Sequence, residues 1–420
     1  MHAFFKKCSL LLASLATFSA FAETPPPDNS LDPDLLSAIS FAAKTFLPEN
    51  QNEDISESIL KGIFGNLDRY SALLTPQEAE QEAGSIAGKA IGFGIQGMAR
   101  KDGIFVEYVV ENSPAGKAGI RYADLIRSAN GISCEELGGA AFQPYLQNLS
   151  RQCEKPAELV VQSPNAAPRN VTLVPAPYRL PSVRGAQILS GTAIGYVRLS
   201  SFTLQTANEC KDALALLRQH PLDALILDLR NNSGGDISFA IEVADLFLPQ
   251  DTTIAWVRKR NERKRILAKS PDGYPELRLA LLIDSQTASA AELLAAALHE
   301  NNRASLFGTK TFGKTSIQGY FAIPSRQSYT ARLTVGYWST PQDSLVRDGI
   351  TPDYVIEQAP EKTPACQNIL SAQPSLPEHS PFKLPATIPD LRPDLQLDAA
   401  FQFLKKTDPA KTPAAPLSDL

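Results

Sequence analysis

The first part of the chain, from Leu31 to about Glu82, has apolar residues at the spacing of amphipathic helices. Positions that recur every three or four residues lie on one face of a helix with about 3.6 residues per turn. This pattern is carried by Leu35, Ile39, Ala42, Phe46, Ile55, Ile59, Ile63 and Leu67. We therefore expect two or three helices in this part.

The pattern changes over residues 88–175, where Gly-rich turns alternate with short β-prone runs. These runs are Ile104–Val110, Leu159–Gln162 and Val171–Val174, and one helix-like segment, 142–149, lies among them. Short strands separated by turn residues predict a small β-rich module.

Residues 186–356 alternate between apolar strands and helical patterns. The strands are expected at Ile194–Leu199, Ala224–Leu229 and Leu279–Ile283, the helices at 206–219, 236–247 and 289–300, and further strands up to Tyr354. Continuous apolar strands with helices between them are typical of a sheet that is buried on both faces. The fold class is therefore α/β.

The chain is rich in Pro, Ala and Ser from Pro360 onwards, until a short amphipathic patch at Leu395–Leu404. We divide it into an N-terminal helical segment, a β-rich module, an α/β core and a Pro-rich C-terminal segment with a short helix. The respective ranges are 31–87, 88–175, 176–356 and 357–420.

The first 22 residues have the pattern of a secretory signal peptide. Lys6 and Lys7 precede a short apolar stretch, and Ala20-Phe21-Ala22 matches an A-x-A cleavage site. We expect residues 1–22 to be removed and the protein to be exported to the periplasm or, alternatively, secreted.

Composition narrows the function further. With 420 residues and 43% hydrophobic positions, the chain is long enough for two or three domains with a sizeable core. The net charge of −5 argues against nucleic-acid binding, which depends on clustered Lys and Arg against phosphates. Only four His are present, and no Cys or His spacing indicates a metal site, so we expect neither metal nor cofactor.

Four cysteines follow the signal segment, and two of them are near neighbours in sequence. In an oxidising compartment Cys134 and Cys153 could close a loop worth about 3 kcal/mol. Because the sequence does not give the distance between them, it does not decide whether they form a disulfide.

Ser289 is a candidate nucleophile because it directly follows an apolar strand and opens a helix. At this position backbone N–H groups are free and the helix dipole is positive, which favours a developing oxyanion. The alternative is structural, because Ser289 and Glu292 also form the S-x-x-E pattern of a capping box. Spacing alone does not decide between the two.

A serine nucleophile needs a base, and the histidines are poorly placed. His299 lies ten residues along the same helix, or about 15 Å away. A lysine can replace histidine as the base if burial or a nearby cation lowers its pKa towards neutrality. Lys314, flanked by Phe312, Gly313 and Ile317, is the best placed, although an exposed loop lysine would look the same.

Residues 308–315 also satisfy the phosphate-loop pattern G-x-x-x-x-G-K-[ST], with Asp228 as a candidate Mg²⁺ ligand. A phosphate loop must lead into a helix. Residues 316–324 are instead β-prone and end in Pro, so we reject a nucleotide hydrolase.

Several ordered motifs together resemble the carboxyl-terminal processing peptidases, or tail-specific proteases. These are exported serine peptidases with a Ser-Lys dyad and an inserted PDZ domain. The motifs are Asn66–Glu78, Ile91–Ile95, Ser113–Ile120, Asp228–Gly235, Phe312–Gln318, Gly349–Asp353 and Leu395–Ala400. The resemblance implies that the core has ClpP/crotonase-like layering and that residues 88–175 are the PDZ domain. One departure is Tyr122-Ala123-Asp124, which stands where Pro-Gly-Asp is usual.

Carried onto this chain, the resemblance makes Ser289 the nucleophile and Lys314 its general base, with Gln318 orienting the amine. The oxyanion hole would be the N–H of Ala290 with one N–H from Gly234 or Gly235, and Glu300 is a weaker accessory candidate. A Gly-Gly turn suits this role because only hydrogen opposes the close approach of the scissile carbonyl.

The PDZ domain would hold the terminal carboxylate of a peptide on the loop formed by Gly92, Phe93, Gly94 and Ile95, while the peptide adds a strand to a sheet edge. A purely structural Gly turn is the alternative. The partners we expect are proteins or peptides with apolar C-termini. The sequence does not decide whether an adaptor protein binds or whether the protein forms an oligomer. The competing function is a non-catalytic binding or chaperone protein on the same scaffold.

Overall fold

The computed structural model describes residues 33–45, 55–152, 154–270, 273–323, 326–357 and 394–406. The predicted signal peptide, residues 1–22, and Cys153 lie outside the described residues. Within these ranges no helix combines the length and the apolar character that a membrane crossing needs. The described residues fall into two compact units, one within 1–83 and 318–335, the other within 84–317 and 336–420.

The first unit contains the predicted N-terminal helices and part of a long β-hairpin. Its elements are α2 (Pro33–Thr45), α3 (Ile55–Gly65), β1 (Ala72–Leu74), most of α4 (Pro76–Ile86), and the greater parts of β17 (Ser316–Ile323) and β18 (Arg326–Ser339). β1 pairs antiparallel with β18, so that Ala72 lies opposite Arg332. The helical pattern of this region therefore predicted the helices and missed the short strand between them.

The β-rich module in the second unit contains two sheets and three short helices. Its strands are β2 (Lys89–Gly92), β3 (Ile95–Ala99), β4 (Ile104–Val109), β5 (Leu125–Ala129), β6 (Ile132–Ser133), β7 (Ala157–Gln162), β8 (Arg169–Leu173) and β9 (Ala176–Arg179). Its helices are α5 (Pro114–Lys117), α6 (Cys134–Leu137) and α7 (Gly139–Arg151). β2 pairs with β9, and the remaining strands form one antiparallel sheet. Apolar side chains of this sheet and of α7 form a separate core around Val106, Ile126 and Phe142.

Cys134 is a buried free thiol at the start of α6. Its Sγ lies 3.7 Å from the Arg100 carbonyl oxygen, to which it can donate a weak hydrogen bond.

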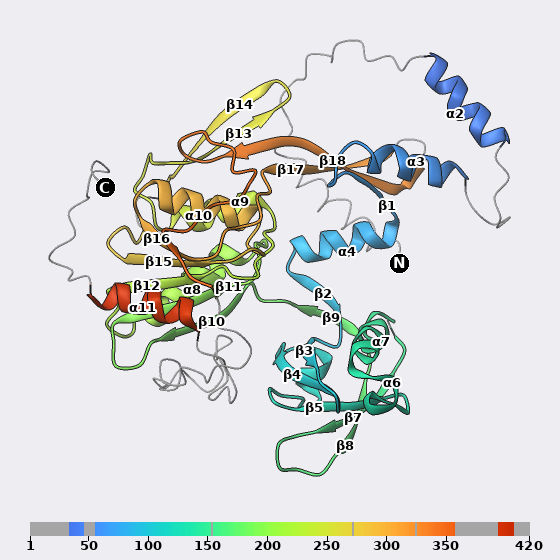
Figure 1. Ribbon diagram of the computed structural model, residues 1–420, viewed down its shortest axis with the longest axis horizontal. Coiled ribbons are helices and arrows are strands. Elements are labelled where there is room, and N and C mark those ends of the chain that lie inside the picture. Colours follow the sequence, from blue (N-terminus) through green and yellow to red (C-terminus); the bar gives the residue numbers. More distant parts are fainter. Residues whose placement is uncertain are drawn as a thin grey trace. The chain divides into compact units, whose positions relative to one another are not determined.

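The α/β core is a six-stranded sheet in the order β10-β11-β12-β15-β16-β19 (Figure 1). Its strands are β10 (Val183–Ile188), β11 (Ile194–Leu199), β12 (Ala224–Asp228), β15 (Arg278–Ile283), β16 (Ala304–Gly308) and β19 (Tyr354–Val355). Only β10 runs antiparallel to its neighbour; the pairs from β11 to β19 are parallel. The carboxyl ends of these parallel strands therefore meet at one edge, where ligand and active sites of such sheets form.

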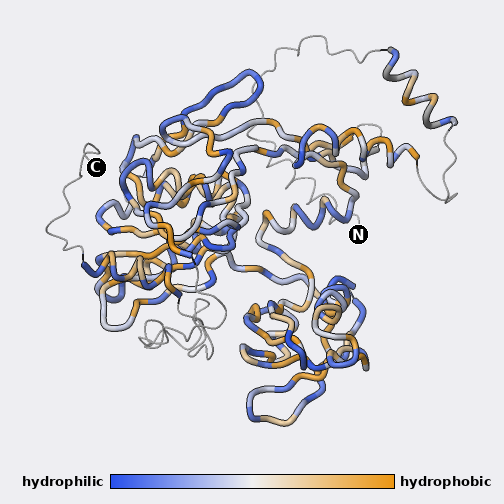
Figure 2. Tube along the Cα trace, in the orientation of Figure 1, coloured by the Kyte–Doolittle hydropathy of each residue, from blue (hydrophilic) through white to orange (hydrophobic). Residues whose placement is uncertain are grey.

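Successive residues of the central strands face opposite cores, as a period of two requires. Leu225 and Leu227 pack with helices α8 (Thr206–Leu217), α9 (Ile237–Asp245) and α10 (Ala290–Glu300). Ala224 and Ile226 face the other side, against α11 (Leu395–Lys406). The hydrophobic character of these strands is visible along the whole sheet in Figure 2. The predicted strands, helices and C-terminal amphipathic patch thus correspond to observed elements.

One hairpin of the second unit was not predicted from the sequence. It consists of β13 (Thr253–Lys259) and β14 (Glu262–Leu267), and β13 also pairs with the end of β18, Trp256 lying opposite Ser339. The charged run over the end of β13 and the start of β14 gives no alternation of apolar and polar positions, which explains why the pattern did not reveal the hairpin (Figure 2).

Candidate active site

Ser289 stands in a sharp turn between β15 and α10. Its backbone has φ +56° and ψ −117°, a region that residues other than glycine rarely adopt and that costs about 1–3 kcal/mol. Ser289 and Glu292 form the capping box that the sequence allowed. A helix N-cap normally has an extended backbone, however, so the strained backbone of Ser289 is not explained by capping. Strained strand-to-helix turns of this kind present the nucleophile in other hydrolases.

The loop after β12 lies directly against this turn. Gly234 has φ +103°, and a Cβ there would lie 2.9 Å from Ser289 Cβ and 3.0 Å from the Ala290 nitrogen. A Cβ on Gly235 would lie 2.0 Å from the Phe202 carbonyl oxygen. Both glycines are therefore required by backbone conformation and by close approach.

The N–H groups around Ser289 are not equivalent. The Gly234 N–H donates to Asn232 Oδ1 at 2.9 Å, and Asn232 Nδ2 in turn donates to the Leu199 carbonyl oxygen at 2.9 Å. Within the described part of the chain, the N–H groups of Gly235 and Ala290 have no hydrogen-bond acceptor. Of the two glycines, Gly235 thus has the N–H that can receive an oxyanion.

Glu292 connects the Ser289 turn to the loop that carries Lys314. Its carboxyl group is fully buried. One oxygen, Oε2, accepts the N–H of Ser289 at 2.8 Å and the N–H of Lys314 at 2.9 Å. The other, Oε1, accepts from Thr311 Oγ1 and the Gly313 N–H, both at 2.6 Å. The backbone nitrogens of Ser289 and Lys314 therefore lie close together, because both donate to the same oxygen of Glu292.

The sequence showed Glu292 only as one half of a capping box. Its bonds to residues 311–314 span about twenty positions and arise from the tertiary fold, so no local pattern could have revealed them. The strand order gives a partial signal, because Ser289 follows β15 and Lys314 follows β16, and these strands are parallel neighbours. Their carboxyl ends must therefore lie side by side.

Lys314 is half-buried, and its carbonyl oxygen accepts a hydrogen bond from the Trp338 indole Nε1 at 3.2 Å. Trp338 is completely buried and fixes this part of the loop. Gln318 lies in β17, where its Nε2 donates to Thr334 Oγ1 at 3.3 Å. Glu300, at the end of α10, accepts the Gln342 N–H at 2.9 Å.

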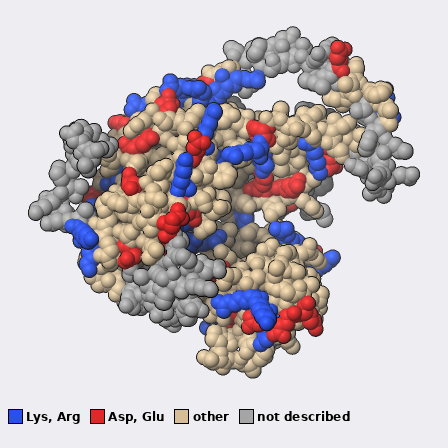
Figure 3. Space-filling model, in the orientation of Figure 1, with Lys and Arg blue, Asp and Glu red and all other residues tan. Residues whose placement is uncertain are grey.

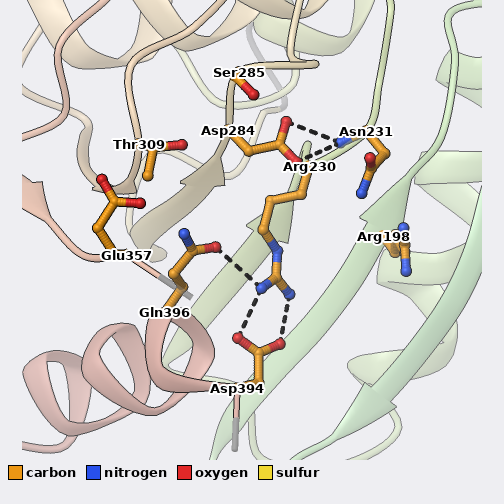
Figure 4. Close-up of a pocket in the computed structure, with 9 residues that line it drawn as sticks. All are labelled: Arg198, Arg230, Asn231, Asp284, Ser285, Thr309, Glu357, Asp394 and Gln396. Carbon is orange, nitrogen blue, oxygen red and sulfur yellow. Dashed lines mark hydrogen bonds and ion pairs between the residues drawn. The ribbon is translucent and has the colours of Figure 1, made fainter. Parts of the chain in front are cut away.

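A buried ion-pair network lies in the segment that precedes Gly234. Asp228, fully buried, accepts from the Tyr196 hydroxyl at 2.8 Å and from Arg230 Nη2 at 2.6 Å. Burial raises the pKa of Asp228, but the Arg230 guanidinium outweighs this effect and holds the pKa below its ordinary value. Arg230 also pairs with Asp394, and this pair borders a cavity of about 420 Å³ (Figure 4). The network fixes the segment before Gly234 against the start of α11.

The same network bears on the phosphate-loop alternative. Both oxygens of Asp228 are engaged by Arg230, and the lysine loop leads into the strand β17 rather than a helix. Within the described ranges, no group of three His, Cys, Asp or Glu side chains is arranged to hold a metal ion. The geometry does not fit a nucleotide site.

In the β-rich module, the predicted carboxylate-binding loop has one donor already in use. The Phe93 N–H donates to Ser150 Oγ at 2.9 Å, and the Phe93 side chain packs in the core of the module. Gly92 and Gly94 have φ +151° and +80°. A Cβ on Gly94 would lie 2.1 Å from Ser113 Cβ, so this glycine is required by close approach. Of the four predicted residues, Gly94 and Ile95 are the better candidates for holding a carboxylate.

Comparison with known proteins identifies the family. The family model for peptidase family S41 matches residues 193–356, and a PDZ domain model matches residues 105–154. The carboxyl-terminal-processing protease of Synechocystis sp. is 30% identical over 322 residues, which are 73% of this chain and 72% of that protein. The chain belongs to the carboxyl-terminal processing peptidases of family S41. It is a serine peptidase with a PDZ domain, as the motifs predicted.

Two further similarities agree with this assignment. The carboxy-terminal-processing protease of Bartonella bacilliformis is 30% identical over 324 residues, 75% of this chain and 72% of that protein. The structure of a Bacteroides fragilis protein assigned to the S41 proteases matches with a TM-score of 0.52 at 16% identity, covering 80% of this chain and 92% of that one. The structural similarity concerns the fold.

Proposed function

We propose that this S41 peptidase is an exported endopeptidase that cleaves peptide bonds with Ser289 as nucleophile and Lys314 as general base. The observation that carries the proposal is the buried Glu292 carboxyl group, which binds the backbone N–H groups of both residues with one oxygen. The strained backbone of Ser289 supports the same role.

The chemistry follows from this arrangement. Ser289 Oγ attacks the scissile carbonyl carbon while its proton passes to the neutral amine of Lys314. The oxyanion is stabilised by the N–H groups of Ala290 and Gly235. When the C–N bond breaks, Lys314 returns the proton to the leaving amine. A water molecule deprotonated by Lys314 then hydrolyses the ester and releases Ser289. Gln318 orients the lysine amine.

The PDZ domain selects the substrate in this proposal. It holds an apolar C-terminal tail through the N–H groups of the loop that contains Gly94 and Ile95, while the tail adds a strand to a sheet edge. The signal-like residues 1–22 support export to the periplasm. Cleavage after Ala22, read from the N-terminal sequence of the protein recovered from the periplasm, tests that part directly.

The experiment for the catalytic part compares the mature protein with Ser289→Ala and Lys314→Ala. Each is incubated with an unfolded reporter ending in apolar residues and with the same reporter ending in charged residues. We expect cleavage by the unaltered protein alone, faster for the apolar tail. Equal cleavage by all three proteins would overturn the dyad. Tail binding without cleavage by any of them would favour the non-catalytic alternative.

A further inference from the structure

The β13–β14 hairpin is strongly basic on a chain whose net charge is −5. Between positions 258 and 265 it carries six cationic residues and one acid, Glu262. The cations are Arg258, Lys259, Arg260, Arg263, Lys264 and Arg265, and all but Lys259 are exposed. Figure 3 shows Lys and Arg side chains gathered along this hairpin. Such a concentration of one sign creates a local positive potential.

One face of the hairpin combines these cations with aromatic rings. Residues directly opposite each other in antiparallel strands share a face. The register places Arg258 between Arg263 on one side and Tyr337 of β18 on the other. Trp256 lies two residues along, with Arg263 stacked 4.5 Å from its ring centroid. Tyr337 is 42% exposed.

One of these contacts works against stability. Arg258 and Arg263 are directly opposed, and like charges at such positions destabilise a strand pair. Arg263 has a counter-charge in Asp343. In the described part of the chain, Arg258, Lys259 and Arg260 make no ion pair.

β14 is also the edge strand of its sheet, and charged side chains on an edge prevent unwanted pairing with other chains. One or two lysines meet that need. The six cations of this hairpin, two of which are directly opposed, are more than the protection of an edge strand requires.

We propose that this face, which we call the basic hairpin face, is a docking surface for an acidic segment of a protein. It is defined by Trp256, Arg258, Arg260, Arg263, Arg265 and Tyr337. Carboxylates pair with Arg258, Arg260 and Arg265, none of which makes an ion pair with a described residue, and the aromatic rings supply contact area. Trp, Tyr and Arg together are the residues that dominate the energy of protein–protein contacts. This composition favours a polypeptide over a lipid surface or a nucleic acid.

The basic hairpin face is connected to the lysine loop. β13 pairs with β18 at Val257 and Trp338, and Trp338 holds the Lys314 carbonyl oxygen through its indole. A partner docked on the outer face of this sheet is thus one strand away from the proposed base. The docking proposal itself does not depend on the catalytic one.

The test measures binding of a labelled peptide in which Glu alternates with Gly, long enough to span the hairpin, with a Gln-Gly peptide as control. The protein is the full chain, and its variant is Arg258→Gln, Arg260→Gln, Arg265→Gln, which leaves the Arg263 ion pair intact. The matched control is Lys211→Gln, Lys405→Gln, Lys406→Gln, which removes three exposed charges from α8 and α11. Circular dichroism and thermal unfolding confirm that both variants fold.

We expect the acidic peptide to bind the unaltered protein, and the hairpin variant to bind it at least about tenfold more weakly. The control variant should change affinity by less than about twofold, and added salt should weaken binding. Equal affinity of the hairpin variant and the unaltered protein, or equal losses in both variants, would overturn the proposal. So would hairpin-dependent binding of anionic phosphatidylglycerol vesicles or of single-stranded DNA without binding of the acidic peptide.

Discussion

At the scale of single residues, the site depends on positions where the backbone rather than the side chain is under constraint. Ser289 occupies a left-handed conformation, and Gly234 and Gly235 approach other backbone groups more closely than any Cβ would allow. The buried Glu292 carboxyl group stabilises the turn by accepting the Ser289 N–H. The strain at Ser289 is therefore offset by a hydrogen bond to Glu292, whose carboxyl group is held in turn by the loop at 311–314.

The Gly234 turn makes a specific prediction. Gly234→Ala should reduce kcat by about a hundredfold or more, because its Cβ meets Ser289 Cβ and displaces the proposed oxyanion hole. Gly191→Ala is the matched control, since Gly191 has φ +68° but no atom within 4 Å of an added Cβ. It should cost about 1 kcal/mol in unfolding free energy and leave kcat unchanged. Equal kcat values for the two variants would contradict this account.

A second prediction concerns Glu292. Glu292→Gln keeps the shape but places an amide NH₂ against N–H and O–H donors, so about 1–3 kcal/mol of stability should be lost. Displacement of the Ser289 and Lys314 backbones should also lower kcat at least about tenfold, with a smaller change in KM. Urea unfolding and steady-state kinetics measure both quantities. Glu276→Gln, in an exposed ion pair with Arg218, should change neither. A Glu292→Gln protein with unaltered kcat would show that Glu292 serves the fold alone.

A third prediction concerns Ala123, which lies in the PDZ domain. It stands where the family usually has glycine, and its φ is +67°. Ala123→Gly should therefore raise the unfolding free energy by about 1 kcal/mol, because the left-handed conformation is strained for alanine. Ala141→Gly, in the helix α7 of the same domain, should lower it by a similar amount, about 1 kcal/mol. Thermal unfolding would contradict this reading if both changes were destabilising.

At the scale of elements, the proposed active site lies where two parallel strands end and the loops that follow them are held together. β15 leads to Ser289 and β16 to the lysine loop. The opposite end of α10 is held by His299, whose Nε2 lies 2.8 Å from Asp353 Oδ1, while the other Asp353 oxygen accepts the Leu306 N–H of β16. One carboxylate thus joins a helix, a strand and the Gly349–Asp353 segment.

This contact predicts a pH dependence of stability. The hydrogen bond to Asp353 raises the pKa of His299 above its ordinary value, although burial opposes the shift. A raised pKa means that the folded protein binds the proton more tightly, so the contribution is complete at pH values below about 6.5 and is lost as the pH rises through the raised pKa. Because both side chains are about one-third exposed, the effect should be less than about 1 kcal/mol.

Urea unfolding between about pH 5.5 and 8.5 measures this contribution. The difference in unfolding free energy between the unaltered protein and His299→Gln should shrink as the pH rises. A difference that is constant or grows over this range would show that the His299–Asp353 pair is not charge-assisted.

At the scale of the whole molecule, the sequence predicted the order of the parts and the family, and the structure added the connections between them. Buried strands such as Ala224–Asp228 were predictable because their apolar runs are local. The choice of Gly235 over Gly234 was not, because it depends on the Asn232 side chain that occupies the Gly234 N–H. The basic hairpin was missed because β14 and the end of β13 are charged rather than alternating. The Arg230–Asp394 pair joins positions 164 residues apart, which no spacing rule connects.

The central claim is that Ser289 is the nucleophile and Lys314 its base. The most direct measurement is labelling with a fluorophosphonate, which modifies activated serines, followed by mass spectrometry of the digested protein. We predict one adduct, on Ser289, that forms faster as the pH rises and about a hundredfold more slowly in Lys314→Ala. An adduct on another residue, or labelling of Lys314→Ala at the rate of the unaltered protein, would contradict the claim.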